Sequence, residues 1–307
     1  MLDEPTFDEI NDAKANMDHI YDQADPRAYV RELGSVGYAI PTAAKPILQQ
    51  LIPELRTKPD DTVRVLDLGC SYGINAALLK HDLTIDDLYD HWGLPELNRA
   101  TTAEIIAQDK DFFAGLEPVE NIEVIGLDVA ENAVAFAEQA GLLDLGLTLD
   151  LESSPLPEAA REDLAPVDLV TSTGCVGYVT EKSFKELLPA LTEGHGPWFA
   201  NFVLRMFPFD AIADTLDEAG FVTEKLDETT FVQRAFASAQ ERESVLEQLI
   251  DQGIDPTGKE TEGYLLAEFY LSRPREDAAR KPLGRLLTAQ DPDTTIIDHR
   301  GAKPFAQ

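Results

Sequence analysis

The stretch VRVLDLGCSYGINAALLK, residues 63–80, constrains the fold more than any other part of the chain. Its first half is a short apolar run that ends at Gly69, which is typical of a buried strand. Its last seven residues, 74–80, have the composition of a helix, and only the loop 69–73 lies between the two. A buried strand that turns directly into a helix predicts a βαβ unit and therefore a parallel sheet.

The same alternation continues along the chain. Seven apolar runs are predicted as strands, at 62–69, 121–129, 145–152, 166–173, 197–205, 221–227 and 263–272. Helical segments follow most of them, at 74–80, 130–143, 181–193 and 209–220. We therefore expect an α/β fold with a seven-stranded, mostly parallel sheet that carries helices on both faces.

The segments outside this alternation divide the chain. Residues 1–60 are predicted as an N-terminal helical cap, or lid, and 61–275 as the main domain. The main domain has two helical insertions, at 81–120 and 237–258. Residues 276–307 are polar and are expected to form a C-terminal tail. Thr84 and Thr101 are the expected N-caps of the helices in the first insertion.

The charge is strongly acidic, with 57 Asp and Glu against 25 Lys and Arg, a formal net charge of −32. A field of this sign opposes nucleic acid and anionic membranes as partners. An acid-rich, lysine-poor surface suits a high-salt cytoplasm, because salt screens the repulsion between carboxylates. The two cysteines form no disulfide framework, and the acidic N-terminus is not typical of a secretory signal, so we expect a cytoplasmic protein.

The loop 69–73 fits two other patterns poorly. It matches G-x-S-x-G, the nucleophile elbow of serine hydrolases, with Ser71 as the nucleophile. That chemistry needs a histidine after the last strand, whereas His195 precedes a strand and His299 lies in the polar tail. The dinucleotide pattern G-x-G-x-x-G fails as well, because Ile74 stands where the third glycine is needed.

The segment VLDLGCSYG resembles motif I of the class I S-adenosylmethionine-dependent methyltransferases, a strand followed by D-x-G-x-G-x-G, with Ser71 at the middle glycine. The resemblance implies the methyltransferase form of the Rossmann-like fold and S-adenosylmethionine as cofactor. Gly69 and Gly73 then permit a close approach of the backbone to the ligand, and Cys70 and Ser71 are small loop residues. Asp67 balances the amino group of the cofactor or orders the loop.

Two further segments fit the same family. Asp128 ends the second strand, where the resemblance implies an acid that binds the ribose hydroxyls, and Val129 follows it. The insertion 81–120 explains why Asp128 lies so far from the glycine loop. Asp150 and Leu151 end the third strand, beside the expected adenine, and Thr173 ends the fourth, facing the sulfonium.

The resemblance does not fix the reaction. The fourth strand ends in STGCVGY rather than the [DN]-PP-[YF] of base and amide N-methyltransferases, so we expect a small-molecule acceptor. Tyr178 and Asn201 are the candidate catalytic residues. Two alternatives stay open: an enzyme that cyclises the aminobutyrate chain of the cofactor and releases methylthioadenosine, and a non-catalytic cofactor-binding module. No cluster has metal-ligand spacing, so no metal is expected, and the oligomeric state is not predicted.

The residues of the predicted cap and of the first insertion are expected to wall the pocket. The aromatic candidates for this wall are Tyr21, Tyr38, Tyr89 and Trp92.

Overall fold

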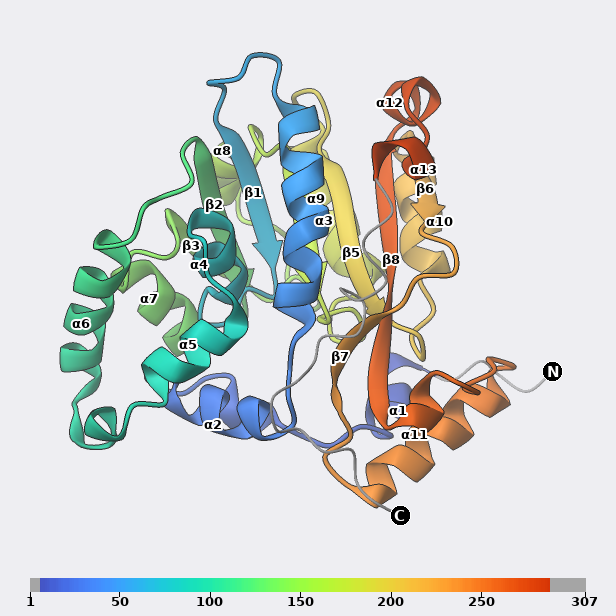
Figure 1. Ribbon diagram of the computed structural model, residues 1–307. Coiled ribbons are helices and arrows are strands. Elements are labelled where there is room, and N and C mark those ends of the chain that lie inside the picture. Colours follow the sequence, from blue (N-terminus) through green and yellow to red (C-terminus); the bar gives the residue numbers. More distant parts are fainter. Residues whose placement is uncertain (1–5, 288–307) are drawn as a thin grey trace.

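The computed structural model describes residues 6–287, and within them eight strands form one sheet. Seven strands follow the order β3-β2-β1-β4-β5-β8-β6, and β7 pairs with β8 (Figure 1). The strands are β1 (Val63–Leu68), β2 (Ile122–Asp128), β3 (Leu145–Thr148), β4 (Leu169–Thr173), β5 (Trp198–Leu204), β6 (Phe221–Lys225), β7 (Phe231–Ala235) and β8 (Tyr264–Pro274).

The sheet is mostly parallel, as predicted. Strands β1 to β5 run parallel to one another, and β8 runs antiparallel between β5 and β6. Asp67 on β1 stands opposite Gly126 on one side and Thr171 on the other. The strand order therefore reverses at β1, and the crevice at its carboxyl end is where doubly wound sheets bind ligands.

The prediction of seven strands was wrong by one, because β7 was missed. Its sequence, FVQRA, places Gln233 and Arg234 in positions that are buried in the fold. Two long polar side chains in a five-residue strand break the apolar run by which a buried strand is recognised.

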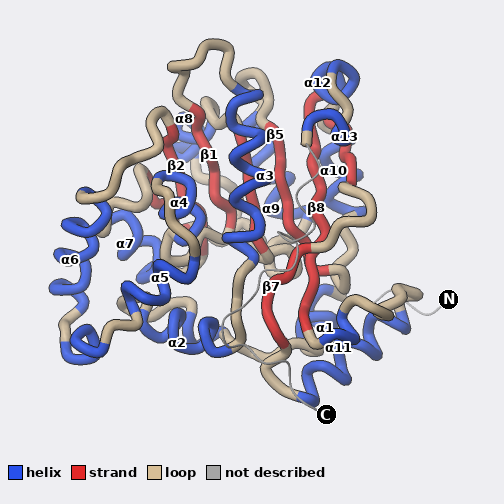
Figure 2. The backbone as a smooth tube through the Cα atoms, viewed as in Figure 1, coloured by secondary structure: helices blue, strands red, loops and turns tan. Residues whose placement is uncertain are grey.

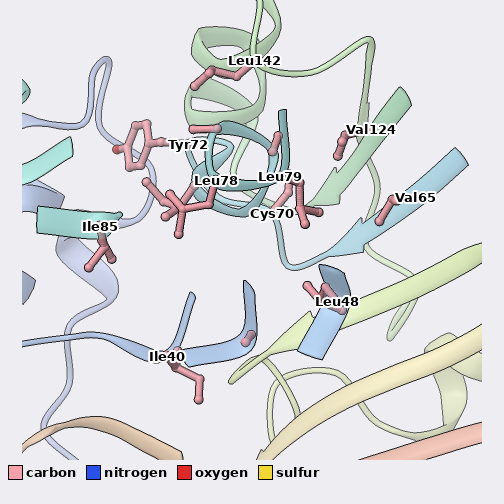
Figure 3. Close-up of a cluster of buried hydrophobic side chains, with 14 of the residues drawn as sticks. Ile40, Leu48, Val65, Cys70, Tyr72, Leu78, Leu79, Ile85, Val124 and Leu142 are labelled. Carbon is pink, nitrogen blue, oxygen red and sulfur yellow. The ribbon is translucent and has the colours of Figure 1, made fainter. Parts of the chain in front are cut away.

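Helices cover both faces of the sheet, with loops gathered at its ends (Figure 2). One face carries α3 (Ile40–Leu55), α4 (Ile74–Lys80) and α7 (Glu131–Gln139), with α5 (Ile85–Trp92) and α6 (Thr102–Ala114) outside them. The other carries α8 (Glu158–Leu164), α9 (Glu181–Leu191), α10 (Asp210–Glu218) and α11 (Ala239–Asp251). Figure 3 shows side chains from α3, α4, β1 and β2 that meet in the first of these two cores.

The insertion 81–120 is helical, and both predicted caps are confirmed. Thr84 begins α5 and Thr101 begins α6, each in a capping box with the acidic residue three positions on. The second insertion contains α11, whose N-cap is Ser238. Such caps satisfy amide groups that the first helical turn leaves without partners.

The N-terminal segment takes two positions. Helix α3 packs on the sheet, whereas α1 (Phe7–Asn11), the 3₁₀ turn Asp18–Ile20 and α2 (Arg27–Ser35) precede it near the carboxyl ends of the parallel strands (Figure 1). Short helices α12 (Arg275–Arg280) and α13 (Leu283–Leu286) follow β8. Residues 288–307 of the predicted tail lie outside the described residues, and the domain boundaries stay a prediction. Over 6–287, no helix has the length and apolar character needed to cross a membrane.

Candidate functional site

A cavity of about 600 Å³ opens at the reversal of the strand order. Its floor consists of the segments that follow β1, β2, β3 and β4, and its outer wall comes from the N-terminal residues before α3. The lining residues predicted from sequence are Gly69, Cys70, Ser71, Asp128, Val129, Asp150, Leu151, Thr173 and Tyr178. Three separate motifs thus converge on one cavity.

The glycine loop is held by the carboxylate that ends β2. Asp128 accepts a hydrogen bond from the backbone N–H of Ser71 at 2.8 Å through Oδ2, and from the N–H of Ala130 at 3.1 Å through Oδ1. Ser71 has a φ of +47°, which few residues other than glycine adopt. The carboxylate of Asp128 therefore stabilises a backbone conformation that is unfavourable for Ser71.

The local backbone conformation and the neighbouring Cys175 require glycine at position 69. Its φ is +76°, and a Cβ at this position would lie 2.6 Å from the Cβ of Cys175 in the loop after β4. Gly73 is also left-handed, but it does not line the cavity. A Cβ there would lie 3.0 Å from the Cβ of Ala137, so the expected approach to a ligand is corrected to an approach to α7.

Ser71 has no base beside it. No histidine of the described chain lines the cavity, and the buried Oγ of Ser71 has no hydrogen-bond partner there. The nucleophile-elbow interpretation therefore has no structural support among residues 6–287.

Asp67 lies behind the cavity wall and acts through Asn75. The carboxylate is fully buried and accepts a hydrogen bond from Asn75 Nδ2 at 2.8 Å, and the same amide nitrogen donates to Thr173 Oγ1 at 3.0 Å. Because Asp67 and Thr173 occupy the amide donors of Asn75, its carbonyl oxygen is the atom left for a ligand. Burial raises the pKa of Asp67 to about 7, against the hydrogen bond from Asn75, which lowers it.

The end of β3 supplies two carboxylates. Asp150 accepts hydrogen bonds from Ser153 Oγ and the N–H of Glu152, and the first of these lowers its pKa. Glu152 accepts from the side chains of Thr180 and Ser183, which joins this loop to the start of α9. Burial raises the pKa of Glu152, but these hydrogen bonds outweigh it and the pKa is lowered.

Asn201 is not part of the cavity, which corrects its assignment as a facing residue. It lies within β5, fully buried, and its Oδ1 accepts a hydrogen bond from Ser172 Oγ on β4 at 2.8 Å. Strand β5 stands beside β4 on the side away from β1, and all of its residues are buried. Tyr178, in contrast, lines the cavity and is 52% exposed, so its ring is open to a ligand.

Of the four aromatic wall candidates, two line the cavity. Tyr21 and Tyr38 do, and Tyr29, which sequence reasoning missed, lies with them. Tyr89 supports the wall from behind by donating its hydroxyl to the carbonyl of Tyr38 at 2.9 Å. Trp92 is buried and donates to Asp109, so it is a packing residue of the insertion.

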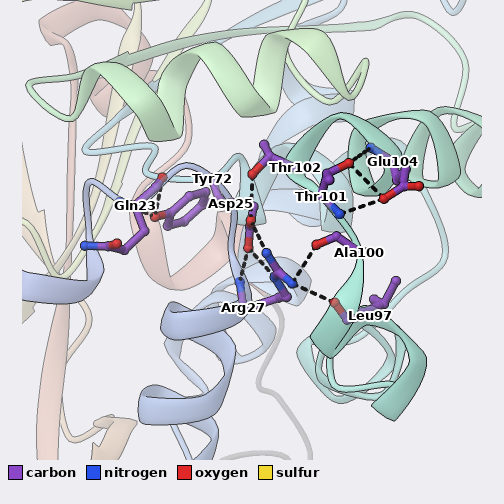
Figure 4. Close-up of polar contacts among 9 residues, drawn as sticks. All are labelled: Gln23, Asp25, Arg27, Tyr72, Leu97, Ala100, Thr101, Thr102 and Glu104. Atoms are coloured by element: carbon purple, nitrogen blue, oxygen red, sulfur yellow. Dashed lines mark hydrogen bonds and ion pairs between the residues drawn. The ribbon is translucent and has the colours of Figure 1, made fainter.

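A partly buried ion pair between Asp25 and Arg27 joins the wall to the insertion (Figure 4). Asp25 receives two hydrogen bonds of 2.7 Å from the guanidinium of Arg27 and one of 2.9 Å from Thr102 at the start of α6. Arg27 also donates to the carbonyls of Leu97 and Ala100. These bonds lower the pKa of Asp25 although its burial alone would raise it.

The charge of the cavity selects the kind of ligand. Its lining contains five carboxylates and four tyrosines, and no Lys, Arg or His of the described residues: Asp18, Asp22, Asp128, Asp150, Glu152, Tyr21, Tyr29, Tyr38 and Tyr178. This set suits a cation with hydroxyl and apolar parts, and it opposes the pyrophosphate of a dinucleotide.

Three lining residues had little or no signal in the sequence. Asn75 is one of two polar residues, with Lys80, in an otherwise apolar helical segment, which is a weak signal for a functional side chain. Glu152 stands next to the predicted pair at the end of β3. Gln233 lies on β7, and because this strand was not predicted, the position of Gln233 at the cavity could not be predicted either.

Comparison with known proteins gives likeness in structure only. No protein-family model and no curated protein matches the chain. Similar solved structures include a TehB-like SAM-dependent methyltransferase from Corynebacterium glutamicum (15% identity, TM-score 0.35, 71% of this chain and 84% of that one). They also include the [4+2]-cyclase SpnF (17%, 0.35, 74% and 80%) and the plantazolicin methyltransferase BpumL in complex with SAH (12%, 0.36, 76% and 84%). At TM-scores this low, the fold is assigned from the strand order described above.

Proposed function

We propose that the chain binds S-adenosylmethionine in the large cavity and transfers its methyl group to a small molecule. The observation that carries the proposal is Asp128, which ends β2 inside the cavity and holds the glycine loop through the N–H of Ser71 at 2.8 Å. This pairs the acid and the loop that the sequence resemblance assigns to one cofactor, at the reversal of the strand order.

The lining fits this cofactor at both of its ends. Each carboxylate oxygen of Asp128 has already accepted one backbone hydrogen bond and retains a further lone pair for a ribose hydroxyl. Val129 and Leu151 offer apolar surface for an adenine, and the carbonyl oxygen of Asn75 offers an acceptor for an ammonium group. The surrounding carboxylates and tyrosine rings favour a cationic ligand.

When bound, the cofactor would supply an electrophilic methyl group on a sulfonium. The chain itself would orient the two reactants and exclude water, and alignment of this kind contributes most of the rate in a simple displacement. Tyr178 is placed to contact the ligand with its ring face and hydroxyl. No step of this scheme needs a nucleophile or metal from the protein.

Calorimetry with S-adenosylhomocysteine tests the binding. We expect an affinity near micromolar, ~8 kcal/mol, and a loss of ~1.5–3 kcal/mol in Asp128→Asn, since hydrogen bonds to a charged group are removed. Asp90→Asn, an exposed residue on α5, is the matched control and should bind as the unaltered chain does. Absence of binding heat and of thermal stabilisation at millimolar ligand would refute the proposal.

Product analysis separates methyl transfer from the two alternatives. The chain is incubated with S-adenosylmethionine alone and then with a filtered extract of small molecules. S-adenosylhomocysteine that forms only with the extract supports methyl transfer. Methylthioadenosine formed without any acceptor would show that the chain cyclises the cofactor instead. Binding of the cofactor with neither product would indicate a non-catalytic module.

A further inference from the structure

A small side pocket of about 40 Å³ adjoins the large cavity. Five residues line both spaces: Tyr21, Tyr38, Gly174, Tyr178 and Gln233. The side pocket adds Lys14 and Arg234, the two cations that the large cavity lacks. A volume of this size holds about three waters or one small polar group.

Lys14 is an unpaired cation. Its Nζ makes no hydrogen bond and no ion pair with any residue from 6 to 287, and it lies 4.8 Å from the ring centre of Tyr178 and 4.7 Å from that of Phe207. The chain around it is anchored on both sides. Asn11 donates to the carbonyl of Gly177 at 2.7 Å, and Glu241 accepts from the N–H of Ala15 at 2.8 Å.

Arg234, unlike Lys14, has an ion-pair partner. Its guanidinium is paired with Glu241 through bonds of 3.0 and 2.5 Å, and it also donates to the carbonyl of Ala235. Glu241 in turn accepts from the N–H of Ala237. The pair is therefore close to neutral, and Lys14 supplies the net positive charge of the side pocket.

Gln233 offers a second donor at the boundary. Its side chain makes no hydrogen bond with the described residues, and its Nε2 lies so close to Gly174 that a Cβ there would be 2.3 Å away. The amide of Gln233 fits here because Gly174 has no Cβ. Gly174 also has a φ of +92°, a conformation that favours glycine. An amide and an ammonium with unused donors thus face one small space.

We propose that the side pocket binds a carboxylate of the molecule that accepts the methyl group, with Lys14 and Gln233 as its donors. The inference rests on the proposed function, because it places the acceptor beside the cofactor cavity. The five carboxylates of the large cavity repel an anion, whereas the side pocket attracts one, so the acceptor has one favoured orientation. Tyr178 lies between the two spaces, where the rest of such an acceptor would reach the cofactor.

The protonation of Lys14 provides the readout. Burial and, to a smaller extent, the charge of Arg234 lower the pKa of Lys14 to about 7, although Glu241 and Asp18 act in the opposite direction. An anion in contact with the ammonium favours the charged form and raises the pKa. Binding of a carboxylate is therefore visible as a change in the titration of one lysine among eleven.

The experiment uses the full chain with ¹³Cε-labelled lysine and follows the lysine signals by NMR from pH 5.5 to 9. The signal of Lys14 is the one that Lys14→Met removes. With S-adenosylhomocysteine present, sodium acetate should raise its pKa by about one pH unit relative to sodium chloride of equal ionic strength. Acetamide should not, and Gln233→Leu should reduce the effect of acetate. An identical pKa in acetate and chloride would overturn the proposal.

A matched control is Lys225→Met. Lys225 also lies over an aromatic ring, 5.7 Å from the centre of Tyr270, but it pairs with Glu268 at 2.7 Å away from both pockets. This variant should leave the response of Lys14 unchanged, and loss of that response would count against a local effect. Lys14→Met removes a partly buried charge that has no ion-pair partner among the described residues, so it is expected to fold, and its thermal unfolding checks this.

Two sources of the carboxylate are distinguished by the cofactor analogues. S-adenosylhomocysteine carries a carboxylate and methylthioadenosine does not. If the first alone raises the pKa of Lys14 as far as acetate does, the carboxylate belongs to the cofactor, and the acceptor subsite is refuted. If acetate raises the pKa but S-adenosylhomocysteine does not bind, the anion pocket stands and the proposed function fails.

Discussion

Replacing Asp67 with asparagine is expected to change how the stability of the fold depends on pH. The carboxylate is fully buried, Asn75 donates to its Oδ1 at 2.8 Å, and its Oδ2 has no partner among the described residues. Asparagine has the same shape and keeps an oxygen for Asn75. The substitution therefore removes the ionisation with little change in packing.

The sign follows from the pKa values in the two states. In the folded chain burial raises the pKa of Asp67 from 3.8 to about 7. Between these values the unfolded chain has lost the proton and the folded chain retains it, so stability falls as pH rises. The stabilisation by the proton is fully present below about pH 4 and is lost as pH passes 7.

The magnitude is large enough to measure. Each pH unit between the two pKa values is worth ~1.4 kcal/mol, so between pH 5 and pH 8 the unaltered chain should lose ~2–3 kcal/mol that Asp67→Asn keeps. Other groups titrate equally in both proteins and cancel in the difference.

The assay is urea unfolding of both proteins at pH 5, 6, 7 and 8 in the same molar KCl. Asp150→Asn is the control, because the pKa of Asp150 is lowered and its titration lies below this window. We expect the advantage of Asp67→Asn to grow with pH and then level off above 7. Parallel stability curves for the two proteins would refute a buried, protonated Asp67.

Three further predictions concern the loop, the ring and the surface. Ser71→Ala should retain most activity, and fluorophosphonates should leave the chain unlabelled, because no histidine among residues 6–287 stands at the cavity; covalent labelling of Ser71 would contradict this. Tyr178→Phe should change turnover mildly and Tyr178→Ala severely if the ring acts by cation–π attraction, worth ~0.5–2 kcal/mol; two severe losses would assign the role to the hydroxyl. The melting temperature should rise steeply with molar KCl, since screening relieves the repulsion of a −32 net charge, and a flat response up to about 2 M would exclude a high-salt adaptation.

Much of the sheet could be predicted because it is buried on both faces. Residues of β1, β2, β4 and β5 are mostly buried, each strand contains a short apolar run, and a loop and a helix follow each strand. The acid at the end of β2 and the glycine loop after β1 were predicted as parts of one cofactor site, and residues of both line the cavity. Their roles in binding remain predictions.

The rest of the site could not be predicted because it depends on contacts between distant segments. Lys14 lines the side pocket, where the hydrogen bond from Asn11 to Gly177, far along the chain, anchors its segment. Asn201 was chosen as a polar residue in an apolar strand, and its polar group is instead used by Ser172 on the next strand. A single sequence records neither which strand follows which in the sheet nor what a buried amide contacts.

Tyr72 connects the glycine loop to the N-terminal segment that forms the outer wall of the cavity. It belongs to the glycine loop, but its side chain is fully buried outside the cavity, where its ring packs edge-on against Tyr29 and Phe136. Its hydroxyl accepts from the N–H of Gln23 at 2.8 Å and faces the carbonyls of Ile20 and Gln23 at 3.1 and 3.0 Å (Figure 4). The glycine loop and the segment that carries Tyr21 and Asp22 are thus joined at one residue. Because Asp128 holds the same loop, we expect a ligand that binds Asp128 to stabilise the far wall of the cavity as well.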